Sequence, residues 1–228
     1  LVEWQLRVAS GEELPKTQDE LSIAGHAIEA RLYAEDPAKG FLPSVGRLTE
    51  FHLNDCDVRV DSGVEEGGEV TPFYDPMIAK LIAHKDDRAA AIEALAGAIE
   101  GSNVWPVRTN GPFILNALRD PDFQAGKIDT GLIERKGDQL SSVPEPDDDQ
   151  LSDAAWKMIK HWQGHDADTT PAPLANFRLN APPTGELSVA IDGKPTTIPI
   201  GEHGNTFYLR AGETGVRFES GGHTFFVE

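Results

Sequence analysis

Residues 77–101 read MIAKLIAHKDDRAAAIEALAGAIEG, an apolar segment of strand length followed by a helix signal. Residues 77–84 are apolar enough to predict a buried strand. Residues 87–101 carry apolar side chains at helical spacing, and Asp86 or Asp87 can accept the free amide hydrogens at the helix start. Gly101 is a natural end for this helix. The apolar stripe consists of Ala91, Ile92, Leu95, Ala98 and Ile99.

The segments on both sides of this unit add further strands and helices. Apolar and polar side chains alternate over residues 25–33, which predicts a strand. Shorter strands are predicted over residues 47–52, 57–61 and 104–107 and around Val70. Helices are predicted from the start of the chain to near Gly11 and over residues 110–118, capped by Thr109 or Asn110. Together these elements predict an α+β domain over residues 1–136.

The second half of the chain has a different character. Residues 137–150 hold prolines, adjacent serines and a run of aspartates without a periodic apolar face, which is typical of an interdomain linker. A helix is predicted over residues 151–163, and strands follow over residues 186–191, 196–200, 206–210, 215–220 and 223–227. Asp192-Gly193 between the first two strands is a hairpin signal. The sequence therefore predicts a second domain, a helix with antiparallel β structure, over residues 151–228.

Composition narrows the classes of function. The chain has 228 residues, 38 Asp and Glu against 20 Lys and Arg, and a net charge of -18. Such an acidic surface argues against nucleic acid and anionic membranes as partners, because both bind cationic surfaces. Cys56 is the one cysteine, so an internal disulfide is excluded and a reducing compartment is expected. The sequence has no apolar run long enough to span a membrane.

The two ends of the sequence lack the features of natural termini. The chain opens on Leu1 with no initiator Met, basic n-region or apolar h-region. It closes on a strand pattern, Thr224 to Val227, with no polar tail. We therefore expect the sequence to be a segment of a longer protein.

Arg59 is the most informative candidate for chemistry. In a strand over residues 57–61, Asp57, Arg59 and Asp61 would share one face. An arginine flanked by carboxylates is held in place and can present its donors to an anion or to a developing oxyanion. The alternative is a structural salt bridge at the surface, which composition alone favours.

Other polar residues give weaker signals. Glu35 and Asp36 could bind a divalent cation, but their place before Pro37 favours a cap or a solvated turn. His161 and His165 have a spacing that could hold a metal, although exposed histidines at a helix end are the commoner case. We therefore assign no metal ligand. Lys80, inside an apolar strand, needs a partner or an aqueous edge.

Four strings in the first domain resemble a known family. They are GHAIEARLYAEDP (residues 25–37), FLPSVG (41–46), VRVD (58–61) and YDPMIAKL (74–81). In this order and spacing they resemble the C-terminal subdomain of biotin carboxylase, across about 135 residues from the start of the chain through Thr109-Asn110 to Glu134. The resemblance implies an antiparallel sheet with helices. It also implies that the catalytic segment of the family lies just before Leu1.

The resemblance also implies an enzymatic activity. Biotin carboxylase uses ATP and magnesium to activate bicarbonate as carboxyphosphate and then carboxylates the ureido N1 of biotin. Arg59 matches the arginine that the family places against the ureido oxygen of biotin. Thr130 falls at an adenine-pocket position where the family usually has an aliphatic residue. The main ATP and magnesium ligands would precede this chain, so we expect the segment alone to be inactive.

The second domain resembles the subunit-bridging (BT) domain of acyl-CoA carboxylase alpha subunits. The carrying residues are Phe177-Arg178-Leu179-Asn180, after a Trp-containing helix and before short strands. In that family an antiparallel β-barrel surrounds a helix and contacts the carboxyltransferase beta subunit. The four residues are most like the 3-methylcrotonyl-CoA carboxylase branch. The Met-Lys-Met sequence of the biotin carrier domain does not occur in this chain.

The resemblance gives a set of expectations about partners and location. We expect a hetero-oligomer in which residues 151–228 bind the beta subunit and the biotin carrier domain of the same subunit visits the first domain. The location would be the bacterial cytoplasm or the mitochondrial matrix. Three alternatives stay open. They are a propionyl-CoA or other acyl-CoA carboxylase, a non-catalytic module for subunit assembly, and a pyruvate or urea carboxylase, which the helix-plus-barrel pattern disfavours.

Overall fold

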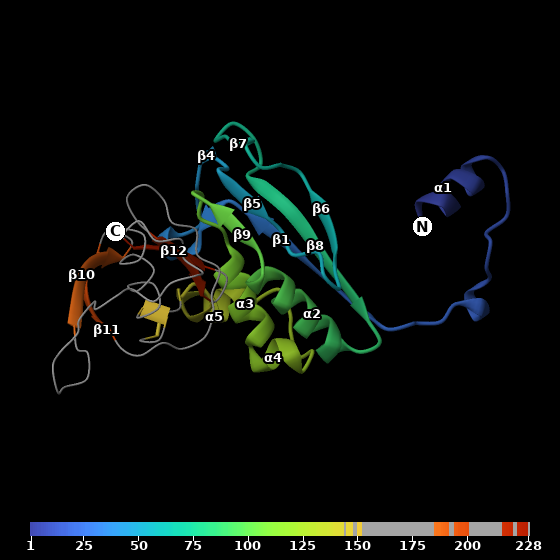
Figure 1. Cartoon of the computed structure of the whole chain (residues 1–228). Helices are drawn as coiled ribbons and strands as arrows, with labels where there is room; N and C mark the ends of the chain where they lie inside the picture. The colour runs from blue at the N-terminus through green and yellow to red at the C-terminus, as the bar shows by residue number, and fades with distance from the viewer. Residues whose placement is uncertain are drawn as a thin grey trace, which may run out of the picture.

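A three-stranded antiparallel sheet forms the centre of the first part of the chain (Figure 1). The computed structural model describes residues 1–143, 145–147, 150–151, 185–191, 194–200, 216–220 and 223–227. Strand β8 (Met77–Lys85) lies between β1 (His26–Tyr33) and β6 (Arg59–Ser62). The strands predicted over residues 25–33 and 77–84 are thus confirmed.

Helix α2 (Arg88–Glu100) confirms the helix that the sequence predicts over residues 87–101. Asp87 is the cap, and its carboxylate accepts a hydrogen bond from the Ala90 amide at 2.8 Å. A cap of this kind satisfies an amide that has no partner inside the helix. The chain therefore turns directly from β8 into a helix that packs against β8 and β1.

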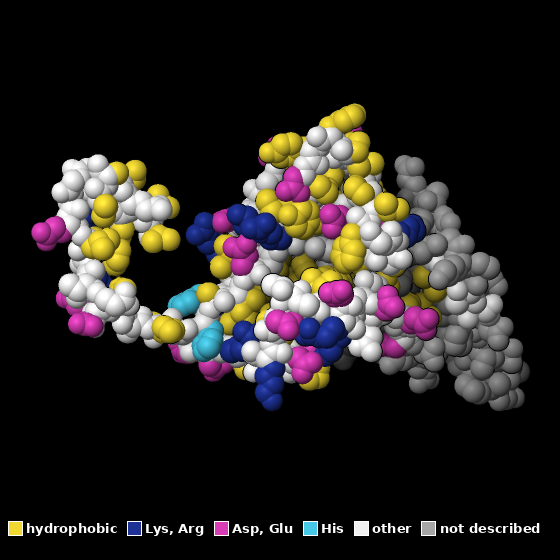
Figure 2. Space-filling view, turned by 180° about the vertical axis from the view of Figure 1, so that it is seen from behind, with side chains coloured by type: hydrophobic (Ala, Val, Ile, Leu, Met, Phe, Trp, Pro, Cys, Tyr) yellow, Lys and Arg dark blue, Asp and Glu magenta, His cyan; other side chains and the backbone are white. Residues whose placement is uncertain are grey.

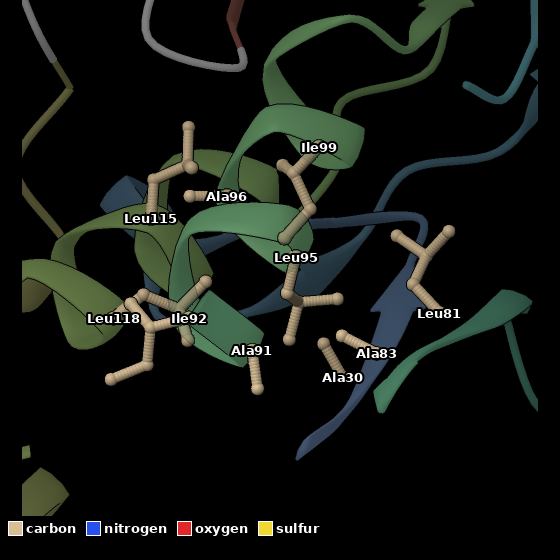
Figure 3. Packing of buried hydrophobic residues seen from close by; sticks show 10 residues of the cluster. All are labelled: Ala30, Leu81, Ala83, Ala91, Ile92, Leu95, Ala96, Ile99, Leu115 and Leu118. Carbon is tan, nitrogen blue, oxygen red and sulfur yellow. The ribbon is translucent and has the colours of Figure 1, made fainter. Parts of the chain in front are cut away.

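One hydrophobic cluster fills the space between the sheet and the helices (Figure 3). Leu81 and Ala83 of β8 and Ala30 of β1 face α2, where Leu95 is fully buried. The predicted stripe of α2 is buried, together with Ala96. Strand β8 buries one face, while Lys80 is half-buried and His84 is exposed on the other. The predicted buried strand is thus confirmed on the face that packs against α2, while Lys80 lies on the half-buried opposite face, where its charge has access to water.

Small two-stranded sheets surround a second cluster that includes Leu48 and Ile78. The pairs are β2 (Glu35–Asp36) with β3 (Leu42–Pro43), β4 (Gly46–Arg47) with β7 (Glu69–Val70), and β5 (Glu50–His52) with β9 (Asn103–Trp105). The single strand predicted over residues 47–52 is thus two strands. The amide of Leu48 bonds Gly68, whereas that of Thr49 bonds Trp105, so the chain changes partner there.

Helix α3 (Gly111–Arg119) confirms the helix predicted over residues 110–118. Thr109 Oγ1 accepts a hydrogen bond from the Gly111 amide at 3.2 Å. Asn110 occupies the cap position, but its side chain bonds β1 instead: Oδ1 accepts from the Tyr33 amide at 2.9 Å, and Nδ2 donates to the Arg31 carbonyl at 3.1 Å. Asn110 is only 8% exposed and ties α3 to the central sheet.

Two helices were not predicted from the sequence. Helix α4 (Pro121–Gln124) begins at Pro121, shortly after the end of the helix predicted over residues 110–118. Proline fits the first turn of a helix because no amide hydrogen is needed there. Helix α5 (Leu132–Leu140) extends into the segment predicted as a linker from residue 137, and Leu140 is buried.

The start of the chain stands apart from this body (Figure 1). Helix α1 (Val2–Ala9) ends before Gly11, as predicted, and has no buried residue. Gly11 adopts a positive φ of 90°, where glycine is favoured. A short 3-10 helix follows at Gln18–Glu20, and another occurs at Pro37–Lys39.

The described part of the second half is a four-stranded antiparallel sheet in the order β11-β10-β13-β12. Its strands are β10 (Gly185–Ile191), β11 (Lys194–Ile200), β12 (Val216–Ser220) and β13 (His223–Val227). Four of the predicted strands are thus confirmed, with the hairpin pairing of β10 and β11. The strand predicted over residues 206–210 and all but the start of the helix over 151–163 lie outside the described residues. The barrel stays a prediction, as does the division into domains at residues 136 and 151.

None of the helices in the described ranges combines the length and the apolar character needed to cross a membrane.

Candidate functional site

Strand β6 presents Arg59 on the open face of the central sheet. Val60 is half-buried and packs against both hydrophobic clusters. Because side chains alternate along a strand, Arg59 and Asp61 point to the opposite face, where both are exposed. Packing of Val60 therefore fixes the backbone, while the charged neighbours stay accessible.

Arg59 is bound by Asp61 at two points. Arg59 Nε donates to Asp61 Oδ1 and Arg59 Nη2 donates to Oδ2, each at 2.8 Å. The hydrogen bonds and the charge of Asp61 raise the pKa of Arg59. The predicted contact between Arg59 and a carboxylate on its own face is thus present for Asp61.

Asp57, the other expected neighbour of Arg59, lies elsewhere. It precedes β6 in a turn with a positive φ of 66°, so it does not share the alternation of the strand. Its carboxylate accepts a hydrogen bond from Lys85 Nζ of β8 at 2.8 Å. This bond and the charge of Lys85 lower the pKa of Asp57. The prediction that Asp57 flanks Arg59 on one face was wrong, because the strand begins two residues later.

Further charges lie beside Arg59 across the sheet. In the strand register, Asp61 lies opposite Lys80 of β8, and Lys80 lies opposite Arg31 of β1. Directly paired residues of antiparallel strands share a face, so these three side chains form one row. Arg59 stands in the neighbouring row, with Ile82 and Glu29. Figure 2 shows Lys and Arg side chains next to Asp and Glu side chains on the body of the molecule.

Thr130 is not brought together with Arg59. It is exposed in the turn before α5, next to Gly131, whose amide bonds Asp129 Oδ1 at 3.0 Å. Arg135 of α5 also bonds Asp129, at 2.8 Å. Figure 1 shows α5 and β6 well separated. Thr130 and Arg59 therefore cannot contact the same small group within this part of the chain.

The acidic pair at residues 35 and 36 is divided between two roles. Asp36 caps the 3-10 helix at Pro37–Lys39, accepting from the Ala38 amide at 3.1 Å, and pairs with Lys39. Glu35 is half-buried, and partial burial followed by the charge of Asp75 raises its pKa. The cap interpretation of Asp36 is thus confirmed. His161 and His165 lie outside the described residues.

Two features of the site were missed from the sequence alone. One is the row of Arg31, Lys80 and Asp61, which depends on the pairing of three strands. The alternation within residues 25–33 gave the two faces of that strand, whereas residues 77–84 were predicted only as an apolar strand, and neither segment gave the register. The other is the link from Asn110 to β1, which joins residues 77 positions apart.

Comparison with known proteins identifies the region that carries Arg59. Residues 29–135 match the family model described as the biotin carboxylase C-terminal domain. The mitochondrial methylcrotonoyl-CoA carboxylase subunit alpha of Dictyostelium discoideum is 37% identical over 190 residues, covering 79% of this chain and 27% of that protein. The propionyl-CoA carboxylase alpha chain of Ruegeria pomeroyi is 40% identical over 182 residues, covering 69% of this chain and 27% of that protein.

Solved structures give the same result for the fold. The biotin carboxylase domain dimer of the 2-oxoglutarate carboxylase of Hydrogenobacter thermophilus, in complex with MgADP, ADP and bicarbonate, aligns with a TM-score of 0.57 at 35% identity. The alignment covers 63% of this chain and 32% of that one. The chain thus spans about a quarter to a third of the length of these proteins.

Proposed function

We propose that this chain, which is homologous to biotin carboxylases and has their C-terminal fold over residues 29–135, is part of the alpha subunit of a biotin-dependent acyl-CoA carboxylase. The intact subunit would carboxylate biotin with ATP and bicarbonate. The observation that carries the proposal is Arg59, held at two points by Asp61 on the open face of the matched domain. Arg59 is the residue that we assign to catalysis.

The chemistry of Arg59 fits the ureido group of biotin. Biotin, when bound, supplies the nitrogen N1 that takes up the carboxyl group. Loss of the N1 proton places negative charge on the ureido oxygen, and a fixed guanidinium stabilises that charge more than it stabilises neutral biotin. An arginine guanidinium is charged at every pH at which the reaction would run, and Asp61 raises the pKa of Arg59 further. Arg59 would bind the oxygen and would neither give nor take a proton.

ATP and magnesium would be held mainly by other parts of the polypeptide. The relative of known structure was solved with MgADP and bicarbonate, which supports these cofactors for the family. Within the described residues, no three His, Cys, Asp or Glu side chains are grouped to hold a metal ion. Thr130, an exposed residue in the turn before α5, would contribute a hydroxyl that can hydrogen-bond an adenine ring.

The acyl-CoA substrate is proposed from the relatives. The methylcrotonoyl-CoA carboxylase relative and the string at residues 177–180 support 3-methylcrotonyl-CoA. Propionyl-CoA is the second candidate, because a propionyl-CoA carboxylase alpha chain is 40% identical over 182 residues. Carboxylation of both acyl-CoA esters by the assembled enzyme, measured side by side, decides between them.

Assembly with a carboxyltransferase beta subunit is part of the proposal. Residues 151–228 would bind that subunit, and the biotin carrier domain would deliver biotin to the face that carries Arg59. The bacterial cytoplasm or the mitochondrial matrix would be the location. A pulldown of the beta subunit with residues 150–228 and, separately, with residues 1–136 tests this. Retention by residues 1–136 alone would contradict it. If the chain served assembly only, the intact subunit would bind its partner without carboxylating biotin.

The activity itself is tested by two matched assays. The first follows ADP release by the intact alpha subunit with free biotin and bicarbonate, and we expect biotin-dependent turnover. The second runs the same assay on residues 1–228 alone, where we expect none, because the ATP site would be incomplete. Absence of biotin-dependent turnover in the intact subunit would contradict the proposed function. Turnover by the chain alone would show that residues 1–228 are sufficient for the reaction.

A further inference from the structure

The two hydrogen bonds between Arg59 and Asp61 use one particular edge of the guanidinium. An arginine side chain has five N–H donors, and Asp61 accepts from Nε and from one N–H of Nη2. The remaining donors are both N–H groups of Nη1 and the second one of Nη2. One N–H of Nη1 and the second N–H of Nη2 lie side by side at the far end of the guanidinium, where an anion can be bound at two points.

We propose that Asp61 is a positioning residue, which holds the side edge of Arg59 so that its end edge is presented to the reacting ureido oxygen. This inference rests on the proposed function and names a second residue of the same site. Asp61 would not touch biotin. It would act by restricting the Arg59 side chain to one orientation before biotin binds.

Burial and strand position support a positioning role over a stabilising one. The side chains of Arg59 and Asp61 are 72% and 41% exposed, and exposed ion pairs contribute only about 0–1 kcal/mol to stability. A free arginine side chain, in contrast, has a large rotamer entropy that must be lost when it binds a ligand. Asp61 removes much of that freedom in advance, and Val60, which lies between Arg59 and Asp61 in the sequence and packs against the core on the other face, fixes their backbone.

Asp57 provides a matched control within the same segment. Asp57 is also a carboxylate two residues from Arg59. Asp57→Asn removes one negative charge, as does the Asp61→Ala substitution used below. Its hydrogen bond goes to Lys85 and not to Arg59. A long-range effect of charge on Arg59 would appear in both variants, whereas positioning would be lost only with Asp61.

The first test measures Arg59 without any activity. In residues 1–228, the ¹⁵N-labelled Nε–H of Arg59 is observed by NMR, and its exchange with solvent is measured. We expect slow exchange in the unchanged chain and in Asp57→Asn, and at least tenfold faster exchange in Asp61→Ala. Equal exchange in all three proteins would overturn the proposal.

The second test uses the intact alpha subunit. Displacing a catalytic group slightly can cost orders of magnitude, so we expect Asp61→Ala to lower kcat for biotin carboxylation about tenfold or more. Bicarbonate-dependent ATP hydrolysis should stay within twofold, Asp61→Glu should recover part of the loss, and Asp57→Asn should resemble the unchanged enzyme.

A double substitution separates this proposal from the proposed function. If Asp61 acts through Arg59, adding Asp61→Ala to Arg59→Ala has no further effect. A further loss in the double variant, or unchanged kcat in Asp61→Ala while Arg59→Ala is impaired, would overturn the positioning role and leave the role of Arg59 standing. Unchanged kcat in Arg59→Ala would overturn both.

Discussion

Replacing Asn110 tests whether one buried amide joins helix α3 to the sheet that carries Arg59. Asn110→Ala removes the acceptor of the Tyr33 amide and the donor to the Arg31 carbonyl. Each hydrogen bond contributes about 1 kcal/mol or slightly more, and unpaired backbone groups in a part-buried site add to the loss. We therefore expect a decrease of about 2–3 kcal/mol in the free energy of unfolding.

The assay is urea unfolding of residues 1–228, followed by far-UV circular dichroism. With a slope of roughly 2 kcal/mol per M, the midpoint of the α+β part should fall by about 1 M. Asn116→Ala is the control, because Asn116 Nδ2 bonds the Leu140 and Ser142 carbonyls near the end of α5 and has no bond to the sheet. We expect a smaller shift for it. A shift below about 0.3 M for Asn110→Ala, or equal shifts for both variants, would refute the reasoning.

Three further changes probe the core and the titrating groups. Leu95→Ala, at a side chain that is 0% exposed, should lower the free energy of unfolding by about 2–5 kcal/mol in the same urea experiment, whereas a loss below 1 kcal/mol would contradict the described packing. The hydrogen bond from Lys136 lowers the pKa of Asp120, so the Asp120 carboxylate stabilises the fold above its unfolded pKa near 4, and this stabilisation is lost as pH falls through the lower folded pKa. Asp120→Asn should reduce the loss of stability in acid, measured by melting curves from pH 7 to pH 2. An unchanged dependence of stability on pH would contradict this assignment. Burial and Asp75 raise the pKa of Glu35, so its charge opposes folding above that pKa; Glu35→Gln should be more stable than the unchanged chain at pH 7 and equal to it in acid, and a destabilised variant at pH 7 would contradict this.

The parts of the fold that the sequence predicted depend on local signals. Helix α2 has its cap, Asp87, and its apolar stripe within one short segment, so neighbouring residues were sufficient. Strands β1 and β8 were likewise visible as alternation or apolar content. These local patterns did not show which strand pairs with which. Residues 46–47 and 50–52 form one continuous pattern, but they pair with residues far apart in the chain.

At the site too, the local sequence did not show which distant residue each side chain contacts. Asp57 and Asp61 are equivalent in the sequence around Arg59. They differ because the turn over residues 54–57 places Asp57 at a positive φ and directs it to Lys85 on another strand. That turn includes a hydrogen bond from the Cys56 amide to Asn54 Oδ1. Helix α5 was missed because it holds few apolar residues and because Gly137, within the helix, was interpreted as the start of a linker.

The central claim is that Arg59 stabilises charge on the ureido oxygen of biotin. Its most direct test is Arg59→Ala in the intact alpha subunit, with Arg31→Ala on the same sheet face as the control. Loss of one such donor typically lowers kcat about 10²–10³-fold. We expect a loss of this size in biotin carboxylation, with bicarbonate-dependent ATP hydrolysis retained and Arg31→Ala much less affected. Equal losses of both activities, or full carboxylation by Arg59→Ala, would contradict the account.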